Sequence, residues 1–306
     1  MSSSTRSPWT GAGTALVTPM DASGAVDFAA FRAHVAAQVS AGIRMLIVGG
    51  TTGEGATLSA DEKSQLLKEA AELAAGRAVV VAGLSCSAGA DSLGEARAAR
   101  AAGADAVLAA VPAYVKPPQD ALVDYFVGLA DDPAGLPVVL YNVPGRTAGG
   151  LELETILELA RHERIVAIKD AKNDLDHTID LAARCQALDF EVLSGDDAST
   201  LAMMALGVTG VVSVVGNQDP VGLVGCVESA LRGDFESARA EHERLLRLMR
   251  FNFVESNPIP VKAMVAAMGY GVNVLRSPLR PLAPQYYAEL EELLRAHPAP
   301  TSETIQ

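Results

Sequence analysis

Lys169 is the residue of this chain whose surroundings most clearly indicate chemistry. It follows the apolar run 165–168 (Ile-Val-Ala-Ile), which predicts a strand buried on both faces. Burial disfavours the charged form of an amine, and an uncharged lysine amine is a nucleophile toward carbonyl carbon. The pattern therefore predicts a lysine that forms a Schiff base. The alternative is a solvent-exposed lysine at a strand end, paired with Asp170 and without a chemical role.

Other side chains suited to the same chemistry also follow strand-like runs. Beside the amine they provide two phenols, two hydroxyls and a guanidinium, a set that suits carbonyl chemistry rather than hydrolysis or phosphoryl transfer. All 5 histidines fall in helical patterns or in the terminal segment, and no His/Cys/carboxylate spacing indicates a metal site, so we expect no metal. The residues are Thr51 and Thr52 after the run 44–48, Tyr114 after 106–111, and Tyr141 and Arg146 after 137–140.

Each of these residues also has a plainer explanation when it is taken singly. The threonines could serve as turn residues, the two tyrosines as a strand-end and a surface aromatic, and Arg146 as the partner of an acid in its loop. Asp196 and Asp197 follow another strand and are expected to cap the next helix. One shared site explains the whole set with fewer coincidences.

The glycine-rich segment 49–55 surrounds the two threonines. It lacks the lysine of a P-loop and the spacing of a dinucleotide-binding motif. A row of backbone N–H groups ahead of a helix binds anions, so the segment suits a small carboxylate. Ser59 and Glu62 have the spacing of a capping box and predict the start of that helix.

Eight strand-like runs, separated by helical patterns of about ten to fifteen residues, position these side chains. Eight parallel strands close a barrel, and no run shows the one-sided alternation of an antiparallel sheet. We therefore predict an α/β fold, a (β/α)8 TIM barrel, with its active site at the carboxyl ends of the strands. The runs are 13–19, 44–48, 78–82, 106–111, 137–141, 165–169, 191–193 and 210–214.

Beyond about residue 222 the strand-like runs stop, and the sequence shows helical patterns only, at 234–250, 260–267 and 283–295. We expect them to form a helical C-terminal extension that packs on the barrel or on a neighbouring subunit. The predicted organisation is a disordered N-terminal tail over 1–10, the barrel over 11–232, the extension over 233–296 and a second tail over 297–306.

The composition argues against several kinds of partner. A net charge of −13 argues against nucleic acid, since nucleic-acid binding requires a basic surface. The longest apolar stretch, 201–216, is too short and too interrupted to cross a membrane, and the N-terminus lacks the apolar region of a signal peptide. Cys86, Cys185 and Cys226 fit buried thiols in a reducing compartment. We expect a cytoplasmic protein without nucleic-acid or membrane partners.

At the residues singled out above, the sequence resembles the dihydrodipicolinate synthase/N-acetylneuraminate lyase family, barrels that form a Schiff base with pyruvate. The likeness runs from about residue 10 to residue 295 and includes several long motifs in register. The arginine of the segment 141–147 resembles the synthase branch, because the lyase branch usually lacks it. The matching segments are Gly50-Thr-Thr-Gly-Glu54, Tyr141-Asn-Val-Pro-Gly-Arg-Thr147, Ile168-Lys-Asp170, Ser194-Gly-Asp-Asp197, Gly210-Val-Val-Ser213 and Asn257-Pro-Ile-Pro-Val-Lys262.

The resemblance implies how pyruvate would be bound and activated. Lys169 would form the imine, and Thr51 and Thr52 would hold the pyruvate carboxylate. Tyr141 would shuttle protons at the imine and at the attacking enamine. Tyr114 would reach across from a neighbouring subunit to complete the proton relay, with the hydroxyl of Thr51 linking the two phenols.

The resemblance also implies the second substrate and the assembly. Arg146 would clamp the carboxylate of L-aspartate-4-semialdehyde, and the backbone at Gly195 and Val212 would line the floor of the site. The implied reaction is that of a lyase, which condenses the two substrates to 4-hydroxy-tetrahydrodipicolinate in lysine and diaminopimelate biosynthesis. It would need no cofactor beyond the covalent pyruvate imine. The implied assembly is a homotetramer, a dimer of dimers.

Two positions depart from the family pattern. Many synthases carry paired aromatic residues in the loop of Tyr114, whereas position 113 is alanine here. Members that lysine inhibits have histidines just after the Thr-Thr loop, where this chain has Ala60 and Lys63. Both departures concern the feedback pocket, so they bear on regulation and leave the predicted reaction intact.

Two other functions remain open from the sequence. The same imine chemistry could cleave a 2-keto-3-deoxy sugar acid or N-acetylneuraminate in an aldolase, although Arg146 argues against a polyol substrate because a polyol needs hydroxyl partners. A barrel kept only as a ligand-binding protein would not need Lys169, Tyr141 and Thr51 together.

Overall fold

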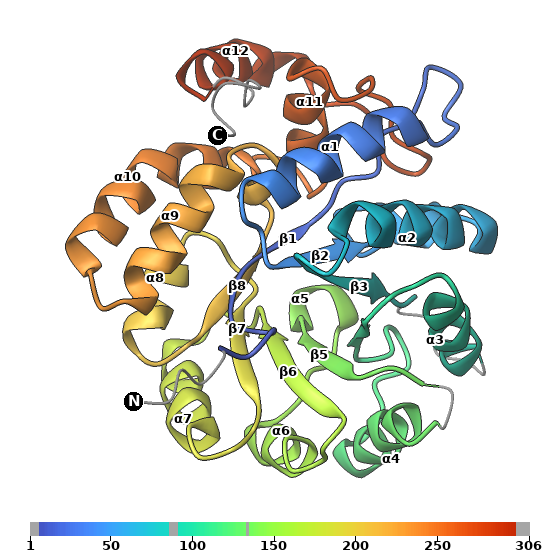
Figure 1. Cartoon of the computed structure of the whole chain (residues 1–306), viewed down its shortest axis with the longest axis vertical. Helices are drawn as coiled ribbons and strands as arrows, with labels where there is room; N and C mark the ends of the chain where they lie inside the picture. Colours follow the sequence, from blue (N-terminus) through green and yellow to red (C-terminus); the bar gives the residue numbers. More distant parts are fainter. Residues whose placement is uncertain (1–5, 86–90, 133–134, 298–306) are drawn as a thin grey trace.

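A closed sheet of eight parallel strands forms the centre of the protein, and helices surround it (Figure 1). The structure, a computed structural model, describes residues 6–85, 91–132 and 135–297 of the chain. Each strand pairs with its neighbours in sequence, and β1 also pairs with β8, which closes the barrel and confirms the predicted (β/α)8 TIM fold. The strands are β1 (Gly11–Ala15), β2 (Met45–Val48), β3 (Val79–Gly83), β4 (Ala106–Ala110), β5 (Val138–Asn142), β6 (Ile165–Asp170), β7 (Glu191–Ser194) and β8 (Gly210–Ser213).

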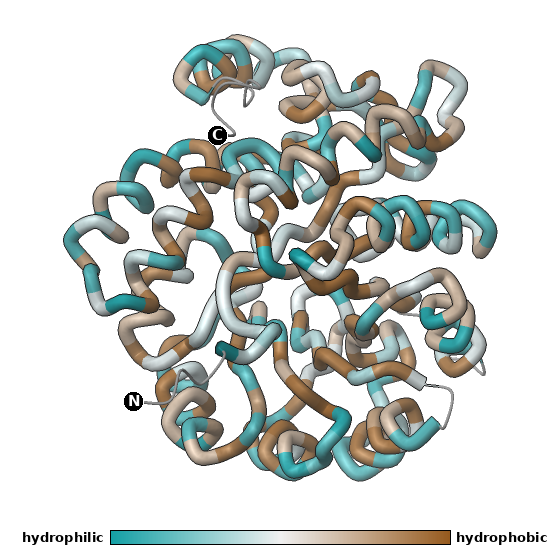
Figure 2. Tube along the Cα trace, in the orientation of Figure 1, coloured by the Kyte–Doolittle hydropathy of each residue, from teal (hydrophilic) through white to brown (hydrophobic). Residues whose placement is uncertain are grey.

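Helices cover the outer face of the sheet. The largest cluster of buried apolar side chains lies between strands and helices, and Figure 2 shows mostly apolar strands inside helices that alternate between apolar and polar residues. This alternation buries one stripe of each helix and leaves the other in water. The helices are α1 (Phe28–Ser40), α2 (Ala60–Ala74), α3 (Ser92–Ala101), α4 (Gln119–Ala130), the short α5 (Pro144–Thr147), α6 (Leu153–Leu159), α7 (Leu175–Cys185), α8 (Thr200–Ala205) and α9 (Pro220–Leu231).

A second apolar cluster fills the inside of the barrel. Alternate side chains of a strand point to opposite faces, so each strand contributes one set to the interior and one to the helices. Tyr141 belongs to the inner set, together with Val212 of β8 and several alanines and aliphatic residues. The inside of the barrel is therefore a packed core, and the site must lie at its rim.

Side chains cap the first two long helices, and the second of these caps is the predicted one. The Asp27 side chain accepts a hydrogen bond from the backbone N–H of Ala30, and Ser59 and Glu62 form the full capping box of α2. The capping box fixes the end of the glycine-rich loop that follows β2, because it sets the residue at which α2 begins.

Three further helices follow the barrel: α10 (Phe235–Phe251), α11 (Ile259–Ala267) and α12 (Tyr287–Ala296). α10 packs along α9, while α11 and α12 continue past α1 (Figure 1). Val261 and Val265 of α11 pack with Val17 and Val214, which follow β1 and β8. Helix α11 therefore lies at the carboxyl ends of the strands, where a TIM barrel has its active site.

The segment 6–10, which the sequence assigns to the N-terminal tail, contacts the barrel. Arg6 forms an ion pair with Glu228 of α9, and Trp9 packs against the inner apolar cluster.

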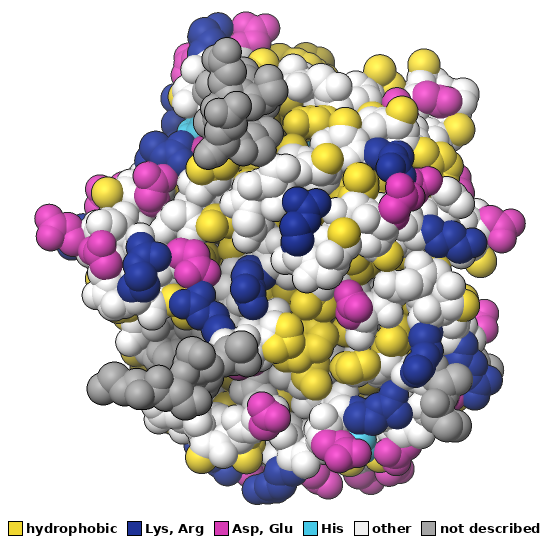
Figure 3. All heavy atoms as spheres, in the orientation of Figure 1, with side chains coloured by type: hydrophobic (Ala, Val, Ile, Leu, Met, Phe, Trp, Pro, Cys, Tyr) yellow, Lys and Arg dark blue, Asp and Glu magenta, His cyan; other side chains and the backbone are white. Residues whose placement is uncertain are grey.

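On the face drawn in Figure 3, acidic and basic side chains alternate around the edge, and hydrophobic side chains gather nearer the middle.

Cys185 and Cys226 are buried free thiols, and burial raises the pKa of each to about 11. Cys86 lies outside the described residues. In the described part of the chain, we find no helix with the length and apolar character needed to cross a membrane.

Candidate active site

Lys169 and Tyr141 lie side by side across strands β5 and β6. They are direct register partners in the parallel sheet, and the Lys169 Nζ lies 4.5 Å from the centroid of the Tyr141 ring. Only 6 % of Lys169 and 9 % of Tyr141 is exposed. An ammonium over the face of an aromatic ring is attracted by the ring quadrupole, so this contact orients the lysine. The site therefore pairs a buried amine with the ring of a phenol.

Asp170 does not pair with Lys169, contrary to the alternative reading of the strand end. Its carboxylate accepts hydrogen bonds from the Asn142 side chain (3.0 Å) and the backbone N–H of Lys172 (2.8 Å). The imidazole of His177 lies 3.0 Å from the same carboxylate. In the described ranges no carboxylate lies within ion-pair distance of Lys169. The amine is thus buried beside the Tyr141 ring without an ion-pair partner among the described residues.

The contacts of Asp170 also fix the strand ends that carry the site. Asn142 follows Tyr141, and Asp170 follows Lys169, so both point away from the barrel interior. Their hydrogen bond ties β5 to β6, and His177 ties β6 to the first turn of α7. This buried polar bridge holds the Lys169–Tyr141 pair in register.

The loop after β2 supplies Thr51 and Thr52. Thr52 is 3 % exposed, while Thr51 is partly exposed and lines the neighbouring cavity. The loop turns tightly: a Cβ at Gly55 would lie 1.8 Å from the carbonyl oxygen of Gly49, so only glycine fits there. This close approach brings both hydroxyls to the rim of the barrel.

A buried ion pair fixes the same loop to the C-terminal extension. The Glu54 carboxylate contacts the Lys262 ammonium of α11, and both side chains are almost fully buried. Glu54 also accepts a hydrogen bond from the backbone N–H of Arg276 (3.0 Å). Burial lowers the pKa of Lys262, and the adjacent carboxylate of Glu54 acts against that effect. A lone buried charge is costly, so loop and extension stabilise each other only while both partners remain.

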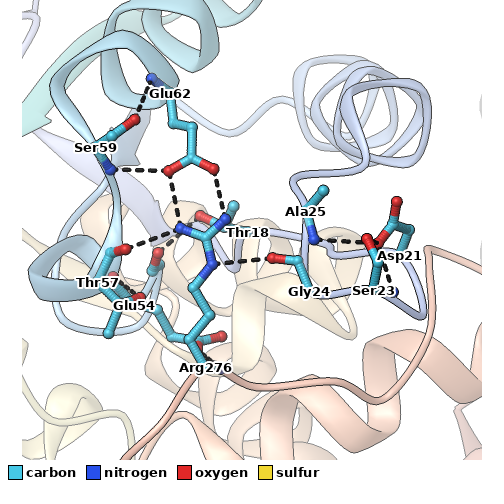
Figure 4. Close-up of polar contacts among 11 residues, drawn as sticks. Thr18, Asp21, Ser23, Gly24, Ala25, Glu54, Thr57, Ser59, Glu62 and Arg276 are labelled. Carbon is cyan, nitrogen blue, oxygen red and sulfur yellow. Dashed lines mark hydrogen bonds and ion pairs between the residues drawn. The ribbon is translucent and has the colours of Figure 1, made fainter.

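Arg276 extends this connection to the start of α2 (Figure 4). Its guanidinium donates to the Glu62 carboxylate (2.5 and 2.8 Å) and to the carbonyl oxygens of Gly24 (3.0 Å) and Thr57 (2.8 Å). The hydrogen bond from Arg276 lowers the pKa of Glu62 to about 2. The segment after α11 therefore secures the loop from its far end.

Arg146 lies in the short helix α5, directly after β5. Its Nη2 donates to the backbone carbonyl of Asn257 (3.2 Å), and no carboxylate in the described ranges lies within ion-pair distance of its guanidinium. The interpretation of Arg146 as the partner of an acid in its loop is therefore wrong. The Asn257 side chain donates to the Thr52 hydroxyl (3.0 Å), so one residue contacts both the loop of Thr52 and the segment of Arg146.

A cavity of about 310 Å³ opens at this rim. Thr51, Tyr141 and Arg146 line it, and Lys169 and Thr52 are buried immediately beside these residues. One wall offers hydroxyl and backbone groups, and another offers a guanidinium, so the cavity suits a small molecule with carboxylate groups.

Gly195 and Val212 lie at the ends of β7 and β8. The Gly195 N–H donates to the carbonyl of Asp170 (2.7 Å), and a Cβ at Gly195 would lie 2.7 Å from Ala171. Val212 belongs to the inner apolar cluster together with Tyr141. Gly195 is thus tied to the end of β6, and Val212 packs inside the barrel.

Asp197 is not a helix cap, so that prediction is wrong. Its carboxylate accepts hydrogen bonds from the backbone N–H groups of Val214 (3.1 Å) and Val215 (2.7 Å), and burial raises its pKa. Asp196 instead accepts from the Ser199 N–H (2.9 Å), in the turn before α8. Asp197 thus fixes the end of β8 rather than the start of a helix.

Tyr114 is not brought to this site within the chain. Its side chain is 93 % exposed, in the loop after β4, and its backbone φ is +74°. A tyrosine in the left-handed region is strained, and structures retain such strain mainly where function uses it. Within the single chain, the Tyr114 ring is therefore exposed to solvent.

Sequence reasoning gave no role to Asn142, His177, Asn257 or Lys262. A role for Asn142 could have been predicted, because it follows Tyr141 in the same strand and its side chain must therefore point to the opposite face of the sheet. The partners of Asn257 and Lys262 lie in distant segments, whereas His177 contacts Asp170, seven residues before it. Within the described residues, no group of three or more His, Cys, Asp or Glu side chains is arranged to hold a metal ion.

The chain is similar to known proteins along most of its length. A sequence model of the dihydrodipicolinate synthetase family matches residues 8–297. A 4-hydroxy-tetrahydrodipicolinate synthase of Koribacter versatilis is 44% identical over 284 residues, which are 92% of this chain and 94% of the relative. The dihydrodipicolinate synthase of Acinetobacter baumannii, solved with pyruvate, has a TM-score of 0.89 and 35% identity, covering 94% of this chain and 98% of that one. A monomeric dihydrodipicolinate synthase variant has a TM-score of 0.90 and 35% identity, covering 95% and 97%.

Proposed function

This chain belongs to the dihydrodipicolinate synthetase family, and from that premise we propose that it is a carbon–oxygen lyase, 4-hydroxy-tetrahydrodipicolinate synthase. It condenses pyruvate with L-aspartate-4-semialdehyde in the biosynthesis of diaminopimelate and lysine. The observation that carries the proposal is the buried Lys169 beside Tyr141, at the edge of a cavity into which Arg146 brings a guanidinium.

The reaction begins at Lys169. Its amine attacks the carbonyl carbon of pyruvate, and loss of water gives an imine. The imine withdraws electrons, so a proton leaves the methyl carbon and an enamine forms. The enamine carbon attacks the aldehyde of the second substrate, which forms the new carbon–carbon bond. The amine of that substrate then adds to the imine carbon and displaces Lys169, which closes the ring and frees the enzyme.

Tyr141 moves the protons in this scheme. Its ring lies against the Lys169 amine, so its hydroxyl is near the atoms at which water leaves and the enamine forms. Thr51 and Thr52 hold the pyruvate carboxylate at the loop that follows β2. The imine supplies the electron sink, so the reaction requires no metal and no organic cofactor.

Arg146 binds the carboxylate of aspartate semialdehyde. A guanidinium presents two parallel N–H donors that fit a carboxylate, and the only partner that the described residues give this side chain is the Asn257 carbonyl. Gly195 and Val212 form the floor under the reacting atoms. A neutral sugar acceptor would leave the guanidinium without its anion, which favours the synthase over a sugar-acid aldolase.

We further propose that the enzyme is a cytoplasmic homotetramer, a dimer of dimers, in which Tyr114 enters the site of a neighbouring subunit. The exposed side chain of Tyr114 and the strained backbone at this residue support one contact between subunits. Leu175 and Ile179 of α7, with Leu206 after α8, are exposed apolar residues that support a second. Light scattering on the purified protein tests the tetramer, and Tyr114→Phe tests the relay.

A panel of aldehyde acceptors tests the function directly. Purified enzyme and pyruvate are combined with aspartate semialdehyde, with N-acetylmannosamine and with a neutral short aldehyde, and pyruvate consumption is followed. The proposal predicts turnover with aspartate semialdehyde at least about tenfold above the others, since the charged partner of Arg146 is worth at least about 1.4 kcal/mol. Preference for N-acetylmannosamine would instead identify a sugar-acid aldolase.

A further inference from the structure

Asn257 contacts the proposed pyruvate site from outside the barrel. It precedes α11 in the C-terminal extension, and its side-chain Nδ2 donates a hydrogen bond to the Thr52 Oγ1 at 3.0 Å. We propose that Asn257 is a positioning residue, which directs the Thr52 hydroxyl proton toward the carboxylate of pyruvate. This inference rests on the proposed function of Thr52.

The argument follows from what a hydroxyl can donate and accept. The Thr52 hydroxyl has one proton and two acceptor lone pairs. Asn257 occupies a lone pair and leaves the proton free, so the hydroxyl is presented as a donor. An anionic substrate needs a donor at this point, and a hydrogen bond to a charged group is stronger than one between neutral groups. Without Asn257, the Thr52 proton could turn toward other acceptors of the loop.

Two details indicate that the Asn257 side chain serves the site. Its Oδ1 is buried and has no hydrogen-bond partner among the described residues, so the amide is not engaged in the fold of the extension. Its backbone carbonyl accepts from the Arg146 Nη2 at 3.2 Å, so the residue also contacts the segment proposed to bind the second substrate. The Oδ1 bears a desolvation cost that a purely structural asparagine would avoid.

The position of Asn257 is fixed independently of Thr52. Lys262, in the following helix, is held by the buried carboxylate of Glu54 in the same loop as Thr52. The loop and the extension therefore remain attached when the amide of Asn257 is removed. Substitution at Asn257 consequently tests the hydroxyl contact rather than the docking of the extension.

The test measures imine formation by borohydride trapping, with pyruvate and with hydroxyacetone, a methyl ketone that lacks a carboxylate. Asn257→Ala should raise the half-saturating pyruvate concentration about two- to tenfold, the range for one hydrogen bond. Asn257→Asp should raise it further, because the aspartate accepts the Thr52 proton and repels the pyruvate carboxylate. Trapping of hydroxyacetone should change less than about twofold in both variants, since no carboxylate is bound.

Asn252→Ala is the matched control. Asn252 lies in the same extension, is fully buried and exchanges two hydrogen bonds with Gln218, away from Thr52. This variant should lose thermal stability but keep the half-saturating pyruvate concentration of the wild type. In a Thr52→Val background, Asn257→Ala should have no further effect on pyruvate.

Two results overturn the role of Asn257 alone: unchanged pyruvate saturation in a folded Asn257→Ala variant, or equal losses for pyruvate and hydroxyacetone. If Asn257→Ala does not fold, the near-isosteric Asn257→Asp decides by the same two criteria. A wild-type enzyme that traps no pyruvate overturns the proposed function itself.

Discussion

The Lys169 Nζ and the centre of the Tyr141 ring lie 4.5 Å apart, on residues that face each other across β5 and β6. Strand pairing sets this distance, because register partners in a parallel sheet cannot separate without breaking the sheet. Behind them, Asn142 and Asp170 are joined by a hydrogen bond of 3.0 Å on the opposite face of the same strands. The fold therefore holds the Lys169–Tyr141 pair from both sides, which would lower the cost of orienting it in the proposed reaction.

The first prediction concerns the imine. Borohydride with pyruvate should add one reduced pyruvyl group per chain to the peptide that contains Lys169. Lys169→Ala should abolish the adduct, because among the described residues only this amine is buried beside the Tyr141 phenol. Mass spectrometry of digested protein measures it. Lys172→Ala is the control, since Lys172 lies three residues away, is partly exposed and pairs with Asp174. Labelling at another lysine would contradict the mechanism.

The second prediction concerns proton transfer. Tyr141→Phe keeps the ring that contacts Lys169 and removes only the hydroxyl. It should therefore lower kcat roughly 10²- to 10⁴-fold, the range that is typical of acid–base groups. The melting temperature should stay close to that of the wild type. Steady-state kinetics and a thermal melt measure the two effects, and near-normal turnover would make Tyr141 a packing residue.

The barrel and the buried position of Lys169 at the end of a strand could be predicted because both depend on local patterns. Unbroken apolar runs predict strands of a parallel sheet, and Ser59 with Glu62 predicts the start of α2 from neighbouring residues alone. The contact of Asn257 with Thr52 joins residues 205 positions apart, and no local pattern encodes it. Glu54 and Lys262 form a buried pair, whereas charged residues are ordinarily expected at the surface. Asp197 follows a strand as a helix cap does, but its carboxylate meets N–H groups of the next strand end.

The third prediction concerns regulation by L-lysine. A cavity of about 250 Å³ lies between α2 and α3 and is lined by Ala60, Lys63 and Asp91, among others. The Lys63 ammonium donates to the Ser85 hydroxyl at 2.9 Å and pairs with Glu95 at 3.8 Å. It therefore already occupies one acid of the cavity and adds a positive charge that a cationic ligand would have to approach. Ala60 and Ala113 provide no ring to close over an aliphatic chain. Half-inhibition by L-lysine should therefore require more than about 1 mM, which corresponds to less than about 4 kcal/mol of binding free energy.

Initial rates at saturating pyruvate, with L-lysine raised into the millimolar range, measure this prediction. Asp91 and Ser87 are the residues from which a rebuilt pocket could draw partners; Asp91 lines the cavity, and Ser87 lies outside the described residues. Half-inhibition well below a millimolar would show that such a pocket binds lysine despite the substitutions.

The fourth prediction concerns stability against acid. His34 is fully buried, its Nε2 lies 3.0 Å from the Asn217 Oδ1, and burial lowers its pKa from 6.5 to about 4. Because the folded-state pKa lies below the unfolded one, the stabilisation is present above pH 6.5 and is lost as the pH falls toward 4. The difference between the two pKa values corresponds to a loss of about 3 kcal/mol in the free energy of unfolding once the pH lies below both.

Urea unfolding of wild type and His34→Gln, at one protein concentration and several pH values from 7.5 to 4.5, measures the contribution. Glutamine can keep a donor toward Asn217 but does not titrate, so the wild type should lose about 2–3 kcal/mol more than the variant over this range. Other titrating groups cancel in the difference. If the free energy of unfolding of wild type and variant changes equally with pH, His34 takes up its proton at the same pH in the folded and unfolded protein, which contradicts the prediction.

The last prediction concerns the second substrate. The Arg146 guanidinium is held by the Asn257 carbonyl at 3.2 Å and lines the cavity beside Tyr141. Aspartate semialdehyde carries a carboxylate beyond its reacting aldehyde, whereas a neutral aldehyde leaves the guanidinium unpaired. A hydrogen bond to a charged group contributes about 1.5–3 kcal/mol of binding free energy. Arg146→Ala should therefore lower kcat/KM for aspartate semialdehyde by about ten- to a hundredfold and raise its KM.

The same variant should still form the pyruvate imine at Lys169, because Arg146 lies on the side of the cavity proposed for the second substrate. It should also lose its preference for aspartate semialdehyde over an uncharged aldehyde. Arg184→Ala is a control, since Arg184 pairs with Glu154 at an exposed position on α7 and should leave both properties unchanged. If Arg146→Ala impairs pyruvate trapping and thermal stability together, the residue holds the loop after β5 and does not select the substrate. A variant that keeps its preference would remove the main physical support for aspartate semialdehyde, because no other cationic side chain lines that cavity in the described residues.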